Sequence, residues 1–501
     1  MATARTPDKP NDGFLSRLVH GVKKLVNGSF ESQVRTGRTA LEMPSHSLAP
    51  LQAPVIASTT GPCAGLCQLQ AELDTPTHES GTEVAGITHW FRPQPHVDGE
   101  SISLYEHKAG STQHHGDPIA DVFAIVARPN NCIMAVADGV NWGIKPRLAA
   151  RCAVHGCVDY LNSKLFECPK SPCTTQDVFH DILRSFHSAQ KLIIQKGGTT
   201  TTLCVAVIVE LQQGKAGGSS KWGLCVVCVG DTLCYVWRKE TQQVHEVTSA
   251  THLGKERNPR DSGGCLGCDL GDQPDLSNLL CCYVPIADGD IVFAVSDGIS
   301  DNMDPVLLKE AASDATPTPT STPSFETIPP FPLPADPTPN AGLQDSTQLS
   351  QLPILTPEQR QAHVLSKLSN MLRDRNVACN FNLTATGVKD AVITSAIEST
   401  EEKRKYLEQC WQEQENCEMT LSEKRANDRK IGRVVRTLPG KLDHATIAAY
   451  RAGKCIVSSE ENVKRGHSAT HSHVMNTAVA QSEQTRRHNK TFAATEKASV
   501  I

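Results

Sequence analysis

The chain has 501 residues, of which 39% are hydrophobic, together with 34 glycines and 30 prolines. This length suits one large domain with additions, or two or three domains of ordinary size. A formal net charge of −5 indicates no general attraction to nucleic acid, so we expect no nucleic-acid partner. Because no apolar run approaches the roughly 20 residues of a membrane span, we also expect no transmembrane segment.

The 19 cysteines occur singly or within apolar runs such as CVVCV at 225–229. They lack the spacing of a small disulfide framework, so we interpret them as reduced residues of a protein core. This usage predicts an intracellular protein, with the cytoplasm as the first expectation and an organelle or a membrane surface as the alternatives.

Residues 1–86 are rich in Thr, Ser, Pro and Ala and are predicted to be mostly disordered. The exception is 14–26 (FLSRLVHGVKKLV), where apolar residues recur at helical spacing with basic residues between them. This basic amphipathic helix would touch a membrane surface peripherally, enter a partner's groove, serve as a presequence or pack on the protein's own domain. The acids Asp8 and Asp12 just before it argue against a presequence.

From residue 87 onward, β-branched and cysteine-rich apolar runs alternate with turn residues and predict strands. The predicted strands cover 121–127, 132–139, 201–211, 222–232, 235–239 and 290–298. Helices are predicted over 147–161 and 174–193. Strands that come in runs, with helices inserted and no regular alternation, favour an α+β fold or layered sandwich over a doubly wound sheet.

Residues 312–357 contain eleven prolines and are predicted to form a disordered loop inserted within the domain. A helix is predicted to follow, with Thr356 as its N-cap and Pro357 at its first position. The charged stretch 398–430 favours a helix by propensity and is predicted to be solvated.

Order is predicted to return at 440–452 (GKLDHATIAAYRA), as a turn, an aspartate and a final strand. Residues 454–501 are polar and aperiodic and are predicted to be a disordered tail. The tail ends in Ser499-Val500-Ile501, which predicts a PDZ-domain partner that would bind these residues as an added strand.

Aspartates recur where the predicted apolar strands begin or end. Asp121 and Asp443 open strands, whereas Asp138, Asp231 and Asp297 close them. A single aspartate at a strand end is most often an ordinary turn residue, and this interpretation remains the alternative for each one. Five in one domain predict that the carboxylates converge.

Converging carboxylates with no Lys or Arg beside them would repel one another unless they were protonated or bridged by cations. Oxygen-only ligands favour hard divalent ions such as Mg²⁺ or Mn²⁺. Two such ions close together suit the hydrolysis of phosphate esters. The pattern therefore predicts a metal site of this kind.

Five motifs in order carry a family resemblance: AD-x16-DG, GGTT, VGDT, SDGISDN and GKLDHAT. Their order resembles that of the metal-dependent type 2C (PPM-type) serine/threonine protein phosphatases. CIMAVADGVNWG (132–143) is most similar to the branch that carries DGVGGW. The resemblance covers roughly 87–453 and implies a central β-sandwich of two antiparallel sheets flanked by helices, in α-β-β-α layers.

The resemblance also implies a catalytic site with two Mg²⁺ or Mn²⁺ ions at one edge of the sandwich. Asp138 would bridge both ions, and the carbonyl of Gly139 would bind one of them. Asp297 and Asp443 would hold the other ion. Together these residues would activate a water molecule that hydrolyses phosphoserine or phosphothreonine in a phosphoprotein substrate, with no phosphoenzyme.

Three further carboxylates match outer positions of the family's site. Asp121 would act on the far ion through water, whereas Asp231 and Asp301 match acidic positions associated with a third, weaker metal.

The sequence departs from the family pattern at three places. Ala120 stands where an acidic residue usually precedes the first motif aspartate, and His444 stands where Asp or Asn is usual. No arginine lies in 110–118, where His114 and His115 are the nearest cationic candidates to grip phosphate. These departures motivate the alternative function, a catalytically impaired type 2C phosphatase-like scaffold or binding module.

Overall fold

The computed structural model describes residues 25–27, 43–62, 83–88, 90, 94–169, 171–212, 221–249, 262–268, 273–313, 352–417 and 419–453. All of them belong to the first of two units, Met1–Lys454, and the second unit is Cys455–Ile501. The predicted C-terminal tail and its PDZ-type ending lie outside the described residues, as does 314–351 of the predicted insertion.

The larger sheet has seven strands in the order β1-β12-β8-β7-β5-β4-β2. All neighbours are antiparallel except β1, which pairs parallel with β12. The strands are β1 (Leu25–Asn27), β2 (Ala57–Gly61), β4 (Val122–Arg128), β5 (Asn131–Ala137), β7 (Leu203–Glu210), β8 (Trp222–Val229) and β12 (Leu280–Ile286).

The smaller sheet has five antiparallel strands in the order β10-β9-β13-β16-β3. They are β3 (Val97–Ser103), β9 (Leu233–Arg238), β10 (Gln243–Glu246), β13 (Ile291–Val295) and β16 (His444–Arg451). The last strand of the described chain therefore lies inside this sheet, between β13 and β3. Two short pairs complete the strands: β6 (Thr200–Thr201) with β11 (Leu266–Gly267), and β14 (Ala312–Ser313) with β15 (Ile354–Leu355).

Strand β4 shows why the two sheets pack as a sandwich. All seven of its residues are buried, as expected for a strand covered on both faces. Val122 and Ala124 point into the core beneath the helices, whereas Phe123 and Ile125 point into the core between the sheets. The period of two thus divides one apolar run between two cores.

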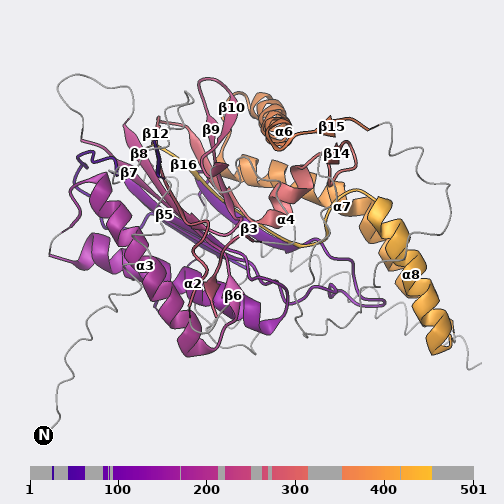
Figure 1. The fold of residues 1–501 in the computed structure, drawn as a ribbon. Helices are drawn as coiled ribbons and strands as arrows, with labels where there is room; N and C mark the ends of the chain where they lie inside the picture. The colour runs from indigo at the N-terminus through magenta and orange to yellow at the C-terminus, as the bar shows by residue number, and fades with distance from the viewer. Residues whose placement is uncertain are drawn as a thin grey trace, which may run out of the picture. The chain divides into compact units, whose positions relative to one another are not determined.

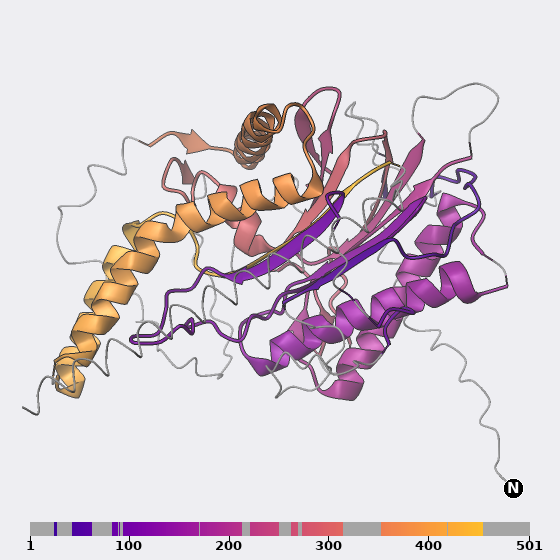
Figure 2. The same cartoon turned by 180° about the vertical axis from the view of Figure 1, so that it is seen from behind.

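Helices cover the outer face of each sheet, which gives the predicted α-β-β-α layers (Figures 1 and 2). Helices α2 (Ile144–Asn162) and α3 (Thr175–Lys196) pack on the seven-stranded sheet, with a π-helical turn η1 (Ser163–Glu167) after α2. Helices α6 (Pro357–Ala378) and α7 (Ala385–Glu415) pack on the five-stranded sheet. The fold is α+β, a sandwich of two sheets flanked by helices, as the sequence predicts.

Helix α6 begins as its sequence predicts. The Thr356 side chain accepts a hydrogen bond from the backbone N–H of Gln359, and Pro357 occupies the first helical position. Its Leu368 and Leu372 are buried against the five-stranded sheet. Arg360 donates to Asp304 Oδ2 at 2.7 Å through Nη2 and at 3.1 Å through Nε, which ties the start of the helix to the loop before it.

The charged stretch 398–430 is predicted to be one solvated helix, but the structure divides it between α7 and α8 (Leu421–Thr437). The α7 part packs on the domain, because Leu407 is buried and Trp411 donates to Glu106 at 2.9 Å. Helix α8 fits the prediction better, since Ile431 is its one buried residue.

The N-terminal region contributes more to the fold than the predicted boundary at residue 87 allows. Strand β2 pairs with β4, and Leu48 and Val84 are buried in the core beneath α2 and α3. The Ser- and Thr-rich sequence of β2, ASTTG, lacks the apolar run that marks the predicted strands. Of the predicted helix 14–26, residues 14–24 lie outside the described residues, and Leu25 and Val26 form a strand instead.

The cysteines of the described residues are all free thiols, and most are buried. In the part of the chain that the structure describes, no helix is long and apolar enough to cross a membrane.

Candidate functional site

Two of the predicted site residues flank one pair of neighbouring strands. Asp121 directly precedes β4, and Asp138 directly follows β5. Val122 pairs with Ala137 in the antiparallel ladder. Register therefore places the two aspartates beside each other at one edge of the seven-stranded sheet.

Two more flank a neighbouring pair in the other sheet. Asp297 follows β13 after one residue, and Asp443 directly precedes β16. Ser296 donates its N–H to the Thr446 carbonyl at 3.0 Å, and Thr446 donates its N–H to Ser296 Oγ at 2.9 Å. These bonds extend the pairing of β13 with β16 up to the aspartates.

The Asp-Gly pair at 297–298 opens helix α4 (Asp297–Ser300) and is not an ordinary turn. A Cβ at Gly298 would lie 1.8 Å from the carbonyl oxygen of His444. Only glycine therefore lets α4 come this close to β16, which brings Asp297 to the end of the neighbouring strand.

Two threonines that directly follow the GGTT motif hold the backbone of Asp138. Asp138 donates its N–H to Thr202 Oγ1 at 3.0 Å, and its carbonyl accepts from the Thr202 N–H and from Thr201 Oγ1, each at 2.8 Å. Thr202 Oγ1 lies 2.6 Å from Thr232 Oγ1, and both hydroxyls are buried. Gly139, the next predicted residue, forms an isolated antiparallel β-bridge with Thr201. Thr232 belongs to the VGDT motif, whereas Thr201 and Thr202 follow GGTT, and the sequence alone does not predict this role for any of them.

The outer carboxylates lie next to the four central ones. Asp231 is in the turn between β8 and β9, and its charge raises the pKa of Asp138. Asp301 begins the short 3-10 helix η3 (Asp301–Met303) that continues α4, and its side chain is 3% exposed. The structure thus brings the predicted carboxylates of both sheets to one edge of the sandwich.

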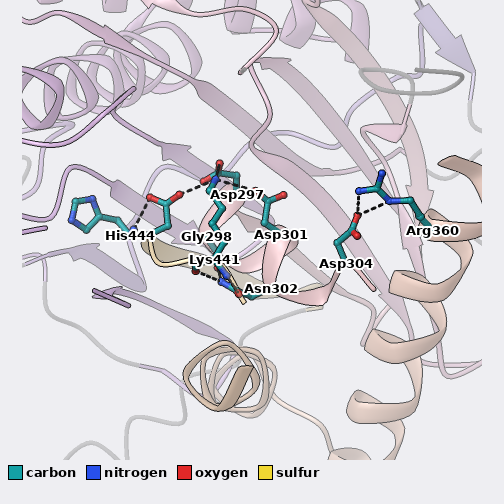
Figure 3. Close-up of polar contacts among 9 residues, drawn as sticks. Asp297, Gly298, Asp301, Asn302, Asp304, Arg360, Lys441 and His444 are labelled. Carbon is teal, nitrogen blue, oxygen red and sulfur yellow. Dashed lines mark hydrogen bonds and ion pairs between the residues drawn. The ribbon is translucent and has the colours of Figure 1, made fainter. Parts of the chain in front are cut away.

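A lysine lies among these carboxylates, contrary to the expectation that no Lys or Arg stands beside them. Lys441 Nζ is 2.9 Å from Asp301 Oδ2 and 2.9 Å from Asp443 Oδ2, and it also donates to Asp297 Oδ2 (Figure 3). Sequence reasoning missed it, although it is the one cation in the motif GKLDHAT.

Backbone contacts hold the loop that carries Lys441. Asn302 is fully buried, donates through Nδ2 to the Gly298 carbonyl at 2.7 Å and the Lys441 carbonyl at 2.9 Å, and accepts from the Lys441 N–H at 2.8 Å. Lys403 of α7 donates to the Gly440 carbonyl. Asn302 therefore links the SDGISDN motif to the GKLDHAT motif, as Figure 3 shows.

Burial and mutual repulsion dominate the electrostatics of the site. Burial raises the pKa of Asp138, and the negative charges of Asp121 and Asp297 raise it further. Burial likewise raises the pKa of Asp443 and Asp121. Burial opposes the charge on Lys441, but the surrounding carboxylates outweigh it and raise its pKa. Among the cations whose contacts are given above, Lys441 is thus the one that offsets the charge of the cluster.

Two of the departures from the family pattern touch each other. Ala120 donates its N–H to His444 Nδ1 at 3.2 Å, and His444 Nε2 lies 2.9 Å from the Gly116 carbonyl, which requires the ring proton on Nε2. Burial lowers the pKa of His444 to about 4, so this neutral form persists at neutral pH. His444 thereby fixes the segment that leads into Asp121. The ring of Tyr105, which no sequence motif marks, meets that of His444 edge-on at 5.4 Å.

The histidines considered as phosphate ligands have other contacts. His114 Nδ1 lies 2.6 Å from the Tyr105 carbonyl, and its ring stacks near His107 with centroids 4.1 Å apart. His115 lies against Trp411 of α7, with ring centroids 5.9 Å apart.

The donor set fits a hard divalent cation on one side of the site. Neither carboxylate oxygen of buried Asp121 receives a hydrogen bond of normal geometry from the residues that the structure describes. Such an oxygen is satisfied by a bound cation. On the other side, Lys441 already supplies positive charge. Among the described residues, no three His, Cys, Asp or Glu side chains are grouped so that they could hold one ion as they stand.

Comparison with known sequences finds a similar protein. A stretch of 233 residues is 44% identical to the PP2C-like domain-containing protein CG9801 of Drosophila melanogaster. The chain is similar to a PP2C-like protein. The match covers 46% of this chain and 32% of that protein, so the chain spans about a third of its relative's length. A scan against models of protein families finds no match.

Solved structures of phosphatases are among those that resemble the chain. The photosystem II phosphatase PBCP is 15% identical and aligns with 72% of this chain and 98% of its own, with a TM-score of 0.33. The phosphatase domain of SpoIIE from Bacillus subtilis is 11% identical over 72% of this chain and 95% of its own, with a TM-score of 0.30. RsbX in complex with magnesium is 10% identical over 72% of this chain and 98% of its own, with a TM-score of 0.29.

Proposed function

We propose that the chain is a Mg²⁺- or Mn²⁺-dependent phosphomonoesterase that removes phosphate from phosphoserine and phosphothreonine in proteins. The observation that carries this proposal is the convergence of Asp121, Asp138, Asp297 and Asp443 from both sheets at one edge. The similarity to a PP2C-like protein supports it. Within the type 2C family, CIMAVADGVNWG favours the branch that carries DGVGGW.

The residues have separate tasks in this proposal. Asp138 and the Gly139 carbonyl, on the sheet edge held by Thr202, would bind two divalent ions jointly with Asp297 and Asp443. Asp121 would act from the neighbouring strand, with Asp231 and Asp301 at a third, weaker position. Divalent ions, when bound, would offset the charge of the phosphoryl oxygens and make a water molecule more acidic. The reduced thiols support an intracellular and, first of all, cytoplasmic location.

Phosphate release from a phosphothreonine peptide in the presence of Mn²⁺ tests the proposal. Asp138→Asn and Asp297→Ala should each lower the rate by about 10²-fold or more, because each removes an oxygen ligand from the reacting centre. Asp390→Asn is the matched control, since that carboxylate is 42% exposed on α7 and should leave the rate unchanged. The proposal fails if the unmodified protein releases no more phosphate than Asp297→Ala.

A second function, a type 2C phosphatase-like module that binds phosphoproteins without turnover, is favoured by Lys441. Its ammonium group lies where the resemblance puts metal ligands, and Ala120 removes an acid from the other side. Calorimetric titration with Mn²⁺ separates the two functions, because a two-ion enzyme should show two binding events. A module should bind a phosphopeptide and leave it intact.

A further inference from the structure

Lys441 lies at a position that the proposed function gives to a divalent ion. Its Nζ contacts Asp297, Asp301 and Asp443, whose side chains are 12%, 3% and 23% exposed. One ammonium group thus serves three carboxylates that are largely removed from water. A divalent ion would seek the same oxygens, because hard cations and ammonium groups both bind carboxylate.

The fold places this ammonium group. The loop before Asp443 is fixed by two hydrogen bonds between Asn302 and the Lys441 backbone, and a third holds Asn302 itself to the Gly298 carbonyl. Gly440 donates its N–H to the Leu307 carbonyl at 3.0 Å and has φ +81°, which favours glycine at this bend. The Lys441 side chain itself is 22% exposed. A long side chain that leaves such a loop has few directions open to it, and the acidic cluster lies in one of them (Figure 3).

We infer that Lys441 is a built-in counter-cation that occupies one cation position of the acidic site and competes with divalent metal for Asp297, Asp301 and Asp443. This inference rests on the proposed function, because it concerns the regulation of the same site. Lys441 lets the protein fold with the charge of this half of the cluster partly offset and no metal bound. It also makes occupancy of the site by two ions depend on displacing the ammonium group.

The charges explain why Lys441 competes with metal on one side of the site only. One ammonium group carries less charge than three carboxylates, so the three oxygens that it contacts still attract cations. The Asp121 side has no such counter-charge among the described residues, and none of them gives its oxygens a hydrogen bond of normal geometry, although the Ser296 and Thr446 side chains lie beside it. A first ion should therefore bind near Asp121 and Asp138, and a second should meet Lys441.

Mn²⁺ binding, measured by calorimetry and by the electron paramagnetic resonance signal of free Mn²⁺, tests the inference without an activity assay. We compare the unmodified protein with Lys441→Ala and with Lys441→Met, which keeps most of the side-chain volume. Each variant should bind the second Mn²⁺ about tenfold more tightly or better, because the competing charge is gone. In chelator, each should melt at a lower temperature than the unmodified protein, and Mn²⁺ should reverse the loss.

Lys389→Ala is the matched control. Lys389 is 16% exposed and also pairs with three carboxylates: it lies 3.7 Å from Asp98, 3.2 Å from Glu100 and 2.9 Å from Asp390. Those carboxylates are more exposed, at 23% to 42%. We therefore expect no change in Mn²⁺ affinity on removing Lys389.

Equal Mn²⁺ affinity in the unmodified protein and in both Lys441 variants, including the absence of binding in all three, would overturn the inference. A gain in Lys389→Ala as large as in Lys441→Ala would do the same, because it would mean that any freed carboxylates bind metal. The proposed function is judged separately by phosphate release. An inactive protein whose Lys441 variants gain metal keeps the inference, whereas an active protein with unchanged affinities keeps only the function.

Discussion

Gly298 is a residue of the site at which the chain has little freedom to change. A Cβ at this position would come within 1.8 Å of the His444 carbonyl oxygen. No side-chain rotation can relieve this clash, because the obstructing atom belongs to the backbone of β16. Any larger residue must push α4 away from the strand and move Asp297 with it.

We therefore expect Gly298→Ala to destabilise the protein by about 1–3 kcal/mol, the usual cost of forcing extra atoms into a packed site. Gly432→Ala on α8 is the control, since a Cβ there meets no atom within 4 Å and alanine favours a helix. Urea denaturation of both variants measures the two effects. Equal stability of Gly298→Ala and Gly432→Ala would show that α4 can move away from β16.

At this scale the sequence predicts the aspartates but not their partners. Asp138, Asp297 and Asp443 stand at strand ends inside recognisable motifs, so their convergence follows from strand pairing within each sheet and from the packing of the two sheets. Lys441 could not be placed in the same way, because nothing in GKLDHAT says whether its side chain turns into the site or into water. His444 is visible in the sequence as a departure from the family pattern, but its contact with Ala120 joins residues 324 positions apart.

Helix α7 contacts the loop that carries Lys441. Lys403 is almost fully buried on the inner face of α7 and donates to the Gly440 carbonyl. Burial, and then the charge of Lys309, lowers the pKa of Lys403 to about 8 from an ordinary value of 10.5. At neutral pH Lys403 is therefore charged, although the folded protein would be more stable with its amine neutral.

This arrangement predicts a specific pH dependence of stability. Between pH 8 and 10.5 the unfolded chain holds the Lys403 proton and the folded chain has released it, so stability due to this group rises with pH. The unfolding free energy of the protein relative to Lys403→Met should rise by about 1–3 kcal/mol from pH 7 to 10.5. Lys405→Met, on the same helix at a side chain 70% exposed, should give a flat difference. A flat difference for Lys403→Met as well would contradict the prediction.

Most elements with strong patterns are predicted, but strand β12, a mostly buried apolar run, is missed. The six predicted strands and the helices over 147–161 and 174–193 are confirmed to within a few residues at their ends. Strand β3 is missed because VDGESIS carries only one buried residue, at Val97. Part of α7 is wrongly predicted to be solvated because its apolar residues are sparse, yet a few of them, with the Trp411 indole, dock the helix.

Across the whole domain, the order of the chain differs from the order of the strands. Strand β16 comes last among the described elements but pairs with β13 on one side and β3 on the other. The five-stranded sheet therefore cannot close until residues 444–451 join it, and β3 has no other partner strand in that sheet. Folding depends on contacts between distant parts of the chain.

Truncation after Leu438 should consequently prevent folding, and the full chain is the reference. The shortened chain loses the strand between β13 and β3 together with the contacts of Asn302 to Lys441. We expect it to lack a cooperative thermal transition in far-UV circular dichroism and to elute early or aggregate in gel filtration. A cooperative transition near that of the full chain would show that the sheet closes without β16.

The sequence-based architecture holds at this scale because strands that come in runs with helices inserted favour an α+β fold, and the family resemblance implies the order of the layers. The N-terminal boundary is less accurate, since the Ser- and Thr-rich β2 pairs at the sheet edge with little apolar signal of its own. The position of β2 is set by its partner β4, whose edge would otherwise have unpaired backbone groups.

The parallel pair formed by β14 and β15 has a consequence for how this domain can vary. Ala312 pairs with Ile354 and Ser313 with Leu355, so the chain leaves and returns at a single point, and Arg360 fastens the returning side to Asp304. The pairing of β14 with β15 fixes the two ends of the intervening chain in the same register, whatever the length of that chain. Doubling such a length costs only about 0.6 kcal/mol in closure entropy. Insertions or deletions between the two strands can therefore accumulate without changing the spacing of the aspartates.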